Sequence, residues 1–387
     1  MKLKILFFVF LLVCSSCALD KKDIINSNFA DIQLKHAFVE MDSVYKSTDK
    51  LLANPRNIDP NGFLRMMASH DWTSGFFPGE LWYMYEYTKE DFWKEKARKQ
   101  TELLEQEKWN GGTHDMGFKM YCSYGNGYRL TQDSGYKDIL LQSAYTLIRR
   151  YNPKVGCIRS WDHNRDKWQY PVIIDNMMNL ELLFWAFRTN GDSTFYQIAV
   201  DHARTTMKNH FRKDYSSYHV IDYDTLTGAV LHKNTHQGYS DASAWSRGQA
   251  WGLYGYTMCY RETGLPEFLE RAKQIASYIF SNPTLPDDLI PYWDYNAPGI
   301  PDEPRDVSAA TVTASALYEL SMYDETNRTG YVDRADRILE NLTNRYRASV
   351  GKDCGFLLLH STGSKTHGSE VDVPIVYADY YLSLIHI

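Results

Sequence analysis

The sequence is dominated by segments with helical periodicity that are joined by short, turn-rich connections. The first has Gln33, Ala37, Met41 and Val44 at spacings of three or four, which is the pattern of an amphipathic helix. Similar segments follow at residues 79–106, 114–131, 136–151, 172–189, 194–211, 243–262, 266–281, 307–324, 329–347 and 371–385. These segments predict an all-α protein with about eleven or twelve helices.

Antiparallel helix pairs in this number can either stack side by side or close into a ring. A closed ring has an inner layer that is apolar throughout, with isolated polar residues at its mouth, and residues 172–185 have that composition. Alternating patterns are scarce, and only residues 218–224 and 229–232 predict a short hairpin. No shift of composition marks a domain boundary, so we expect one domain from about residue 31 to 387. A helical pattern continues through residues 382–387 without a polar cap, which leaves a truncated C-terminus open.

The first 17 residues are typical of a secretion signal. Lys2 and Lys4 precede an apolar run at 5–13 that is too short to span a bilayer. The run ends near Cys17, where the sequence resembles a bacterial lipoprotein cleavage site, although Cys14 stands where Leu is usual. We therefore predict an exported, periplasmic protein with a lipid anchor on Cys17 and a tether at residues 18–30. An ordinary cleaved signal is the alternative, and no other stretch predicts a membrane helix.

Composition narrows the class of partner. A net charge of -6 argues against nucleic-acid binding, but it allows a small anionic substrate that is held by local positive groups. Aromatic residues make up 14% of the chain, which fits either aromatic-rich helices or a sugar cleft where flat rings stack on pyranoses. The cysteines beyond the signal lack CxxC spacing, so we expect buried free thiols and no zinc site at Cys122, Cys157, Cys259 and Cys354.

Two loops rich in glycine and aromatic residues precede helical segments and contain polar candidates. One spans residues 69–79 and includes Trp72, and the other spans residues 113–118 and includes His114 and Asp115. Each is also compatible with a tight turn in which a Thr or Asp side chain caps a helix.

Asp175 is the most informative single residue, because it stands inside the apolar run at 172–180. On a helix, Asn179 would share its face. A buried charge is unfavourable unless it is hydrogen-bonded or protonated, and low polarity raises the pKa of a carboxyl group. A raised pKa suits a general acid near neutral pH. The alternative is a structural aspartate in a satisfied hydrogen-bond network.

Arg247 and Trp251 lie four residues apart, so they can share a helical face. A guanidinium can bind a sugar carboxylate through two hydrogen bonds while indole rings stack on the sugar, or the two residues can form a cation–π pair in the core. His236 and Gln237 lie just upstream and can add polar contacts. A lone histidine such as His219 is more often structural.

A polar loop at residues 361–372 leads into the last helical segment, which contains Tyr377. Ser364 and Lys365 in this loop can bind an anion such as sulfate, or they can belong to a solvated turn.

Four motifs occur in order along the chain: HDMGF at 114–118, PVIIDNMMNLE at 171–181, WSRGQAW at 245–251 and SEVDVPIVYADYY at 369–381. Together they resemble the unsaturated glucuronyl hydrolases, glycoside hydrolase family 88, over nearly the whole chain. After Tyr381 the sequence departs from the family pattern. The resemblance implies an (α/α)6 barrel, which agrees with the predicted number of helices.

The resemblance also implies an unusual reaction. Members of the family release a non-reducing uronic acid with a C4=C5 double bond, left by a polysaccharide lyase, by hydrating the vinyl ether instead of attacking the anomeric carbon. By position, Asp175 matches the general acid and base, and Asp115 matches a second required carboxylate. The other expected contacts with this unsaturated uronyl oligosaccharide are His114, Trp72, Trp161, His219, Gln237, Arg247, Trp251, Ser364, Lys365 and Tyr377. No metal or organic cofactor is implied.

Three other functions fit parts of the pattern. A related unsaturated rhamnogalacturonyl hydrolase would hydrate pectin fragments, although WSRGQAW favours the glucuronyl class. A non-catalytic glycan-binding lipoprotein would need neither aspartate, and a polysaccharide lyase on a similar barrel would need a Tyr/His/Arg set. The sequence leaves open whether the parent polysaccharide is chondroitin, hyaluronan or heparin, with the Ser364-Lys365 loop pointing to sulfated sugars.

Overall fold

The computed structural model describes residue 39 and residues 53–59, 61–349 and 352–385. The predicted signal, Cys17, the tether and nearly all of the first helical segment lie outside the described residues.

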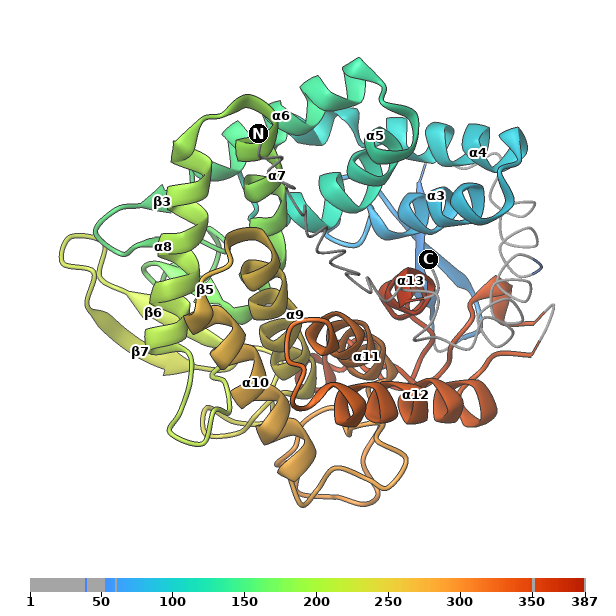
Figure 1. Cartoon of the computed structure of the whole chain (residues 1–387). Coiled ribbons are helices and arrows are strands. Elements are labelled where there is room, and N and C mark those ends of the chain that lie inside the picture. The colour runs from blue at the N-terminus through green and yellow to red at the C-terminus, as the bar shows by residue number, and fades with distance from the viewer. Residues whose placement is uncertain (1–38, 40–52, 60, 350–351, 386–387) are drawn as a thin grey trace, which may run out of the picture.

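The described helices form two concentric layers (Figure 1). The inner layer closes, since each inner helix packs on the next and α13 packs on α3. It consists of α3 (Phe76–Thr88), the π-helix η2 (Gly117–Gly125) with α5 (Asn126–Thr131), α7 (Leu180–Asn190), α9 (Ser246–Thr263), α11 (Val307–Ser321) and α13 (Val376–Ile385). The outer layer consists of α4 (Asp91–Glu102), α6 (Ser134–Ile148), α8 (Ser193–Asn209), α10 (Pro266–Ser281) and α12 (Arg328–Arg345). The predicted (α/α)6 barrel is thereby confirmed.

Burial explains why the two layers differ. The inner helix α9 is buried at every position from Ser246 to Cys259, because it contacts helices on both sides and the outer helix behind it. The outer helix α10 is buried only along one stripe that includes Phe268, Ala272 and Ile275, as expected of an amphipathic helix with one face in water. The apolar spacing of the sequence therefore decides which layer a helix joins.

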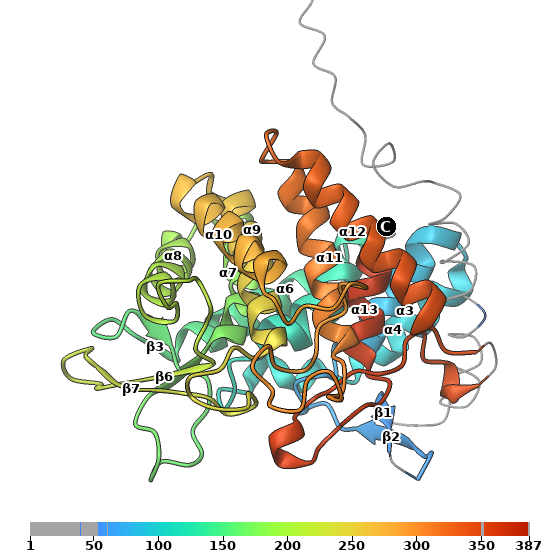
Figure 2. The ribbon, with the colours of Figure 1, turned by 90° about the horizontal axis from the view of Figure 1, so that it is seen from below.

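Three small antiparallel sheets and the long connections lie at one end of the barrel, which we call the strand end (Figure 2). The sheets pair β1 (Asn54–Ile58) with β2 (Leu64–Met67), β3 (Tyr151–Asn152) with β4 (Cys157–Ile158), and β6 (Val220–Tyr223) with both β5 (Pro171–Ile173) and β7 (Val230–Asn234). The predicted hairpin is confirmed as β6–β7. Because these connections run into α3, α7 and α9, the inner helices begin at the strand end.

Two predicted helices are interrupted, and both interruptions have a local cause. The segment 79–106 breaks where Lys89, with φ 61°, ends α3 in the left-handed conformation. In the segment 172–189 the α-helix begins only at Leu180. The residues before it form β5 and then the 3-10 helix η3 (Ile174–Asn179). Short 3-10 turns also occur at η1 (Glu105–Trp109), η4 (Asp353–Gly355) and η5 (Lys365–His367).

Two smaller predictions concern thiols and the membrane. Cys122, Cys157 and Cys259 are buried free thiols as expected, whereas Cys354 is free but exposed. Among the described residues, none of the helices has the length and apolar character of a membrane-spanning segment.

Candidate active site

A cavity of about 560 Å³, which we call the cleft, is lined by residues from Arg56 to Tyr377 that lie mostly in the connections at the strand end. It is lined by nine of the twelve residues that the sequence predicted for the site: Trp72, His114, Asp115, Trp161, Asp175, Gln237, Arg247, Ser364 and Tyr377. His219, Trp251 and Lys365 are the three that do not line it.

Asp175 lies in the 3-10 helix η3, directly after β5, and not, as predicted, on the face of an α-helix. The register of β5 on β6 pairs Ile173 with Val220, so Asp175, two residues after Ile173, lies near His219, the residue just before β6. The neighbouring Asn176 donates from Nδ2 to the carbonyl of Ile158 at 2.8 Å, which anchors η3 to β4. Asp175 is therefore fixed from both sides.

His219 lies directly behind Asp175 and has only one tautomer available as a neutral ring. Its Nδ1 accepts hydrogen bonds from the backbone N–H groups of His236 and Gln237, both at 3.1 Å. The hydrogen of the neutral ring must then be on Nε2, which lies 3.5 Å from Oδ2 of Asp175. The side chain of His219 is 1% exposed, so it reaches the cleft only through Asp175.

The charge state of Asp175 differs from the prediction that low polarity raises its pKa. Burial does push the pKa of Asp175 upward, but the hydrogen bond and charge of His219, with the charges of His114 and Arg247, outweigh burial and lower it below the ordinary value. In the free protein Asp175 is thus an ionised carboxylate.

Asp115 is positioned by its own loop and by the segment that carries Asp175. Thr113 donates from Oγ1 to Oδ2 of Asp115 at 2.6 Å, and Nε2 of His114 lies 3.2 Å from Oδ1. Asn179, at the end of η3, accepts from the backbone N–H groups of Gly117 and Phe118 and so caps η2, the helix that follows Asp115. The two aspartate-bearing segments are therefore joined by a side chain.

Gly117 is required for this junction. A Cβ atom at position 117 would lie 2.6 Å from the Cα of Asn179 and 2.8 Å from its Oδ1, both closer than real contacts. Only glycine lets the start of η2 approach η3 this closely.

Several buried polar atoms at the cleft have no hydrogen-bond partner among the described residues. They are Nδ1 of His114, Nε1 of Trp161 and the hydroxyl of Tyr377, while Oδ2 of Asp175 and Nε2 of His219 face only each other, at 3.5 Å. Buried polar groups are rarely left unpaired, since each costs about 1–3 kcal/mol. Their concentration at one cavity indicates a site for a polar ligand.

Arg247, at the start of α9, places a positive charge at the cleft although the residue is less than 2% exposed. Its Nη1 donates to Asp306 and to the carbonyl of Thr362, and its Nη2 donates to the carbonyl of Gly363. The guanidinium lies over the rings of Trp245, at 4.4 Å, and Tyr377, at 5.3 Å. Three of its five N–H groups are thus used by the protein, so the predicted fork to a sugar carboxylate has only the other two.

Two tryptophans from different loops line the cleft as candidate sugar-stacking surfaces. Trp72 packs at 5.0 Å from Tyr377 and at 5.4 Å from Phe118. Trp161 stacks on His163 with a ring separation of 5.4 Å and an interplanar angle of 18°. Both are partly exposed, which leaves ring surface open to the cleft.

Two predicted contacts are placed away from the cleft. Trp251 is fully buried and packs on Phe118 and Tyr381, because the fourth position after Arg247 points into the core of the barrel. Lys365 forms an ion pair with Glu303, with its ammonium 5.5 Å from the ring of Trp293. Its charge is compensated there, so the structure does not bring it together with Ser364 in the cleft.

The cleft also contains His236, which the sequence suggested as a polar contact, and residues that the sequence interpretation did not select: Arg56, His70, Ser160, His163 and Glu370. Arg56 donates to both carboxylate oxygens of Glu370 and to Asp71, so it joins β1 to the loop before α13. Burial and the charge of nearby His219 lower the pKa of His236 to about 3, which makes it a neutral cleft residue. Only the run of polar residues between Trp161 and Trp168 could have pointed to His163.

Within the described residues, no group of three or more His, Cys, Asp or Glu side chains is arranged to hold a metal ion. The arrangement offers two carboxylates, a histidine behind one of them, one buried cation and two aromatic surfaces.

Comparison with known proteins places this arrangement in a family. The model of Glycosyl Hydrolase Family 88 matches residues 42–381. The unsaturated glucuronyl hydrolase of Formosa agariphila is 51% identical over 317 residues, which cover 81% of this chain and 79% of that protein. The unsaturated chondroitin disaccharide hydrolase of Streptococcus pneumoniae is 33% identical over 82% of this chain and 81% of that protein.

A solved structure agrees with the same assignment. The crystal structure of an unsaturated glucuronyl hydrolase specific for heparin superimposes with a TM-score of 0.88 and 46% identity, over 92% of this chain and 96% of that one. The cleft and its two aspartates lie inside the matched residues, and the chain therefore belongs to glycosyl hydrolase family 88.

Proposed function

We propose that Asp175 is the general acid and base of an unsaturated glucuronyl hydrolase that hydrates the C4=C5 bond of lyase-made glycosaminoglycan oligosaccharides. The enzyme class follows from the family and from relatives at 51% and 46% identity. The assignment of Asp175 rests on one observation. Its carboxylate ends in a cavity where buried polar atoms of His114, Trp161 and Tyr377 lack partners, as a site for a hydroxyl- and carboxyl-bearing ring requires.

The reaction requires two proton transfers, both through the carboxyl group of Asp175. Protonated Asp175 gives its proton to C4 of the unsaturated ring, and positive charge develops at C5 and the ring oxygen. Water then adds to C5 and returns a proton to the Asp175 carboxylate, so that one water molecule has been added across the double bond. The resulting hemiketal opens and the rest of the oligosaccharide leaves, with no covalent bond to the protein.

Asp175 must gain a proton before it can act as an acid, because its pKa is lowered in the free protein. We infer that the substrate brings this about. A uronate carboxylate entering the cleft adds a negative charge and expels water, and both effects raise the pKa of a neighbouring carboxyl group. Asp115 and His114 then hold the ring beside it.

Heparin-type fragments are the substrate class that we favour. The relative described as specific for heparin shares 46% of its residues with this chain, whereas the chondroitin disaccharide hydrolases share 32–33%. Sulfate groups would then meet the cleft residues Ser364 and His163, since Lys365 is paired with Glu303, and Arg56 with Glu370 and Asp71.

A panel of lyase-made unsaturated disaccharides tests this assignment. Disaccharides from heparin, chondroitin and hyaluronan, with and without sulfate, would be followed by loss of the ultraviolet absorbance of the double bond. The expected result is the highest kcat/KM with a heparin-derived disaccharide. Preference for chondroitin or hyaluronan fragments would reject the heparin assignment but not the reaction. If the absorbance falls with none of the disaccharides, the reaction itself is rejected.

We also propose export, with lipidation at Cys17. The support is the charged, apolar and cysteine-terminated start of the sequence. Expression in a bacterial host with a labelled fatty acid should give a labelled, membrane-associated protein, and Cys17→Ala should remove the label. Unlabelled parent protein in the periplasm would instead indicate an ordinary cleaved signal.

A further inference from the structure

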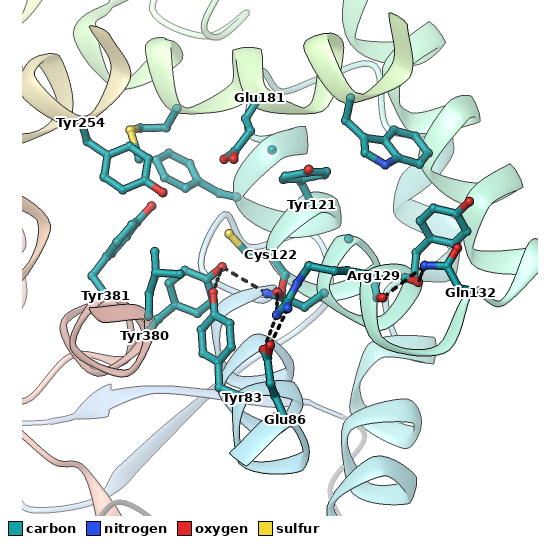
Figure 3. Close-up of a pocket in the computed structure, with 18 residues that line it drawn as sticks. Tyr83, Glu86, Tyr121, Cys122, Arg129, Gln132, Glu181, Tyr254, Tyr380 and Tyr381 are labelled. Atoms are coloured by element: carbon teal, nitrogen blue, oxygen red, sulfur yellow. Dashed lines mark hydrogen bonds and ion pairs between the residues drawn. The ribbon is translucent and has the colours of Figure 1, made fainter. Parts of the chain in front are cut away.

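A second cavity, of about 540 Å³, lies further along the same inner helices (Figure 3). We call it the rear cavity; it is lined by Tyr83, Glu86, Tyr121, Cys122, Asn126, Tyr128, Arg129, Gln132, Glu181, Trp185, Tyr254, Tyr380, Tyr381 and Leu384, among others. On α9 it is reached at Tyr254, seven residues after the cleft residue Arg247, which is about 10 Å along the helix axis. On α13 it extends from Tyr380 to Leu384, whereas the cleft touches Tyr377.

The two cavities are separate but share one wall. Phe118, in the first turn of η2, lines both of them. The cleft residues Asp115, Asp175, Trp72 and Trp161 do not line the rear cavity. A ligand there is therefore not the oligosaccharide held in the cleft, and its binding does not depend on the reaction proposed above.

The rear cavity presents hydroxyl groups that the protein does not use. Six tyrosines line it, and the hydroxyls of Tyr83 and Tyr380 bond to each other at 2.8 Å. Those of Tyr121, Tyr254 and Tyr381 have no partner among the described residues, although Tyr254 is 8% and Tyr381 2% exposed. Figure 3 shows Tyr254 on one side of the Glu181 carboxylate and Tyr121 on the other. These hydroxyls are open to the cavity, so they can form hydrogen bonds with a ligand or with water there.

The charges in the rear cavity are compensated within the protein. Glu181 is paired with Arg261, and Glu86 accepts two hydrogen bonds from Arg129. Burial raises the pKa of Tyr121 and of Tyr254, so both phenols stay neutral. An anionic ligand would find no unpaired cation among the lining residues that the structure describes.

These features specify the chemistry of the ligand. Neutral phenols can both donate and accept hydrogen bonds, and Glu181 can accept, whereas the amide nitrogens of Asn126 and Gln132 already donate within the protein. Aromatic rings on several sides suit the C–H faces of a pyranose. We propose that the rear cavity is a binding site for an uncharged sugar unit, distinct from the catalytic cleft.

Ligand-observed NMR titration of the full-length protein tests this proposal, with D-glucose and N-acetyl-D-glucosamine as the neutral probes and D-glucuronate as the charged one. Tyr254→Phe and Tyr381→Phe each keep the ring and remove one hydroxyl, and each should weaken neutral-probe binding roughly two- to tenfold. Tyr260→Phe is the matched control, because Tyr260 lies on the same helix, partly exposed and outside both cavities.

A second control separates the rear cavity from the cleft. Trp161→Ala removes a cleft ring and should leave neutral-probe binding unchanged, and any binding of D-glucuronate should be insensitive to Tyr254→Phe. The proposal is overturned if neither neutral probe binds at millimolar concentration. It is equally overturned if binding is kept at full strength in both Tyr254→Phe and Tyr381→Phe, whether or not Trp161→Ala loses it, because the probes would then not use the hydroxyls of the rear cavity.

Discussion

The two ends of the barrel hold cavities of nearly equal volume, about 560 and 540 Å³, yet their polar groups are arranged in opposite ways. At the strand end, polar atoms of His114, Trp161 and Tyr377 are buried without partners among the described residues. In the rear cavity, both carboxylates are paired with arginines. The inner helices begin at the strand end, and the positive ends of their dipoles favour anions there. The helix dipoles therefore favour an anionic ligand at the strand end even though the net charge of the chain is -6.

The largest expected effect breaks the cleft chemistry directly. Asp175→Asn keeps the shape of the side chain but cannot deliver a proton, so turnover should fall by about 10²–10⁴-fold or more while the oligosaccharide still binds. Loss of absorbance of the double bond measures turnover. Asp166→Asn, in an exposed loop outside the cleft lining, is the control and should stay near the parent rate. A rate within tenfold of the parent for Asp175→Asn would remove Asp175 from the mechanism.

The next prediction compares how much an ion pair stabilises the protein at each end of the barrel. Lys119, at 0% exposure, pairs with Glu107 at 2.7 Å, and Glu107 also accepts from Ser69 and Asn110, which hold the loops carrying Trp72 and Asp115. Lys119→Met leaves a buried carboxylate unpaired and should lower the free energy of unfolding by about 3–5 kcal/mol.

The matched variant at the other end is Arg129→Met. Arg129 is 48% exposed and pairs with Glu86, so its removal should cost about 0–1 kcal/mol. Urea unfolding of both variants measures the difference. If both variants lose the same free energy of unfolding, the ion pairs at the two ends contribute equally to stability, and the comparison is wrong.

A third prediction concerns the protonation of Asp175. Its pKa is lowered in the free protein, so near neutral pH it starts ionised, and a bound uronate should raise that pKa and draw up to about one proton from solution. Calorimetry of a saturated glucuronyl disaccharide in two buffers of different ionisation enthalpy measures this uptake. Asp175→Asn should abolish it. Identical heats in both buffers for the parent protein would mean that the proton comes from elsewhere.

The same lowered pKa has a consequence for stability. A carboxyl group whose pKa is lower in the folded than in the unfolded state binds fewer protons when folded, so it stabilises the protein above its unfolded pKa and loses that contribution as pH falls. Asp175→Asn should therefore reduce the pH dependence of unfolding on the acid side.

Sequence periodicity predicted most of the barrel but less of the cleft, and the difference has a physical cause. Helices such as α10 were predicted at their observed bounds, because their spacing reports one buried face. Local spacing failed at Asp175, where β5 pairs with β6 across 47 residues of sequence, and it failed at Trp251, where the helix turns the ring into the core. Arg56 and Glu370 meet across 314 residues, so no local pattern could join them. The pKa of Asp175 likewise depends on His219 and Arg247, which only folding brings near.

Arg247 shows why the choice of variant matters for testing substrate binding. Arg247→Ala is not a clean test, since it would leave Asp306, which is fully buried, without its cation and so weaken the fold as well as the site. Tyr377 offers a better probe. Its ring packs on Trp72, but its buried hydroxyl has no partner among the described residues and lies at the cleft.

The smallest predicted effect therefore belongs to Tyr377→Phe. Losing one hydrogen bond to the bound ring should raise KM roughly two- to tenfold, with little change in the free energy of unfolding, because the ring and its contacts remain. Tyr260→Phe, outside both cavities, should leave KM unchanged. If Tyr377→Phe instead stabilises the protein and leaves KM unchanged, the unpaired hydroxyl is only a defect of packing. The unpaired Tyr377 hydroxyl would then no longer be evidence that the cleft, unlike the rear cavity with its compensated charges, has polar groups that bind a ligand.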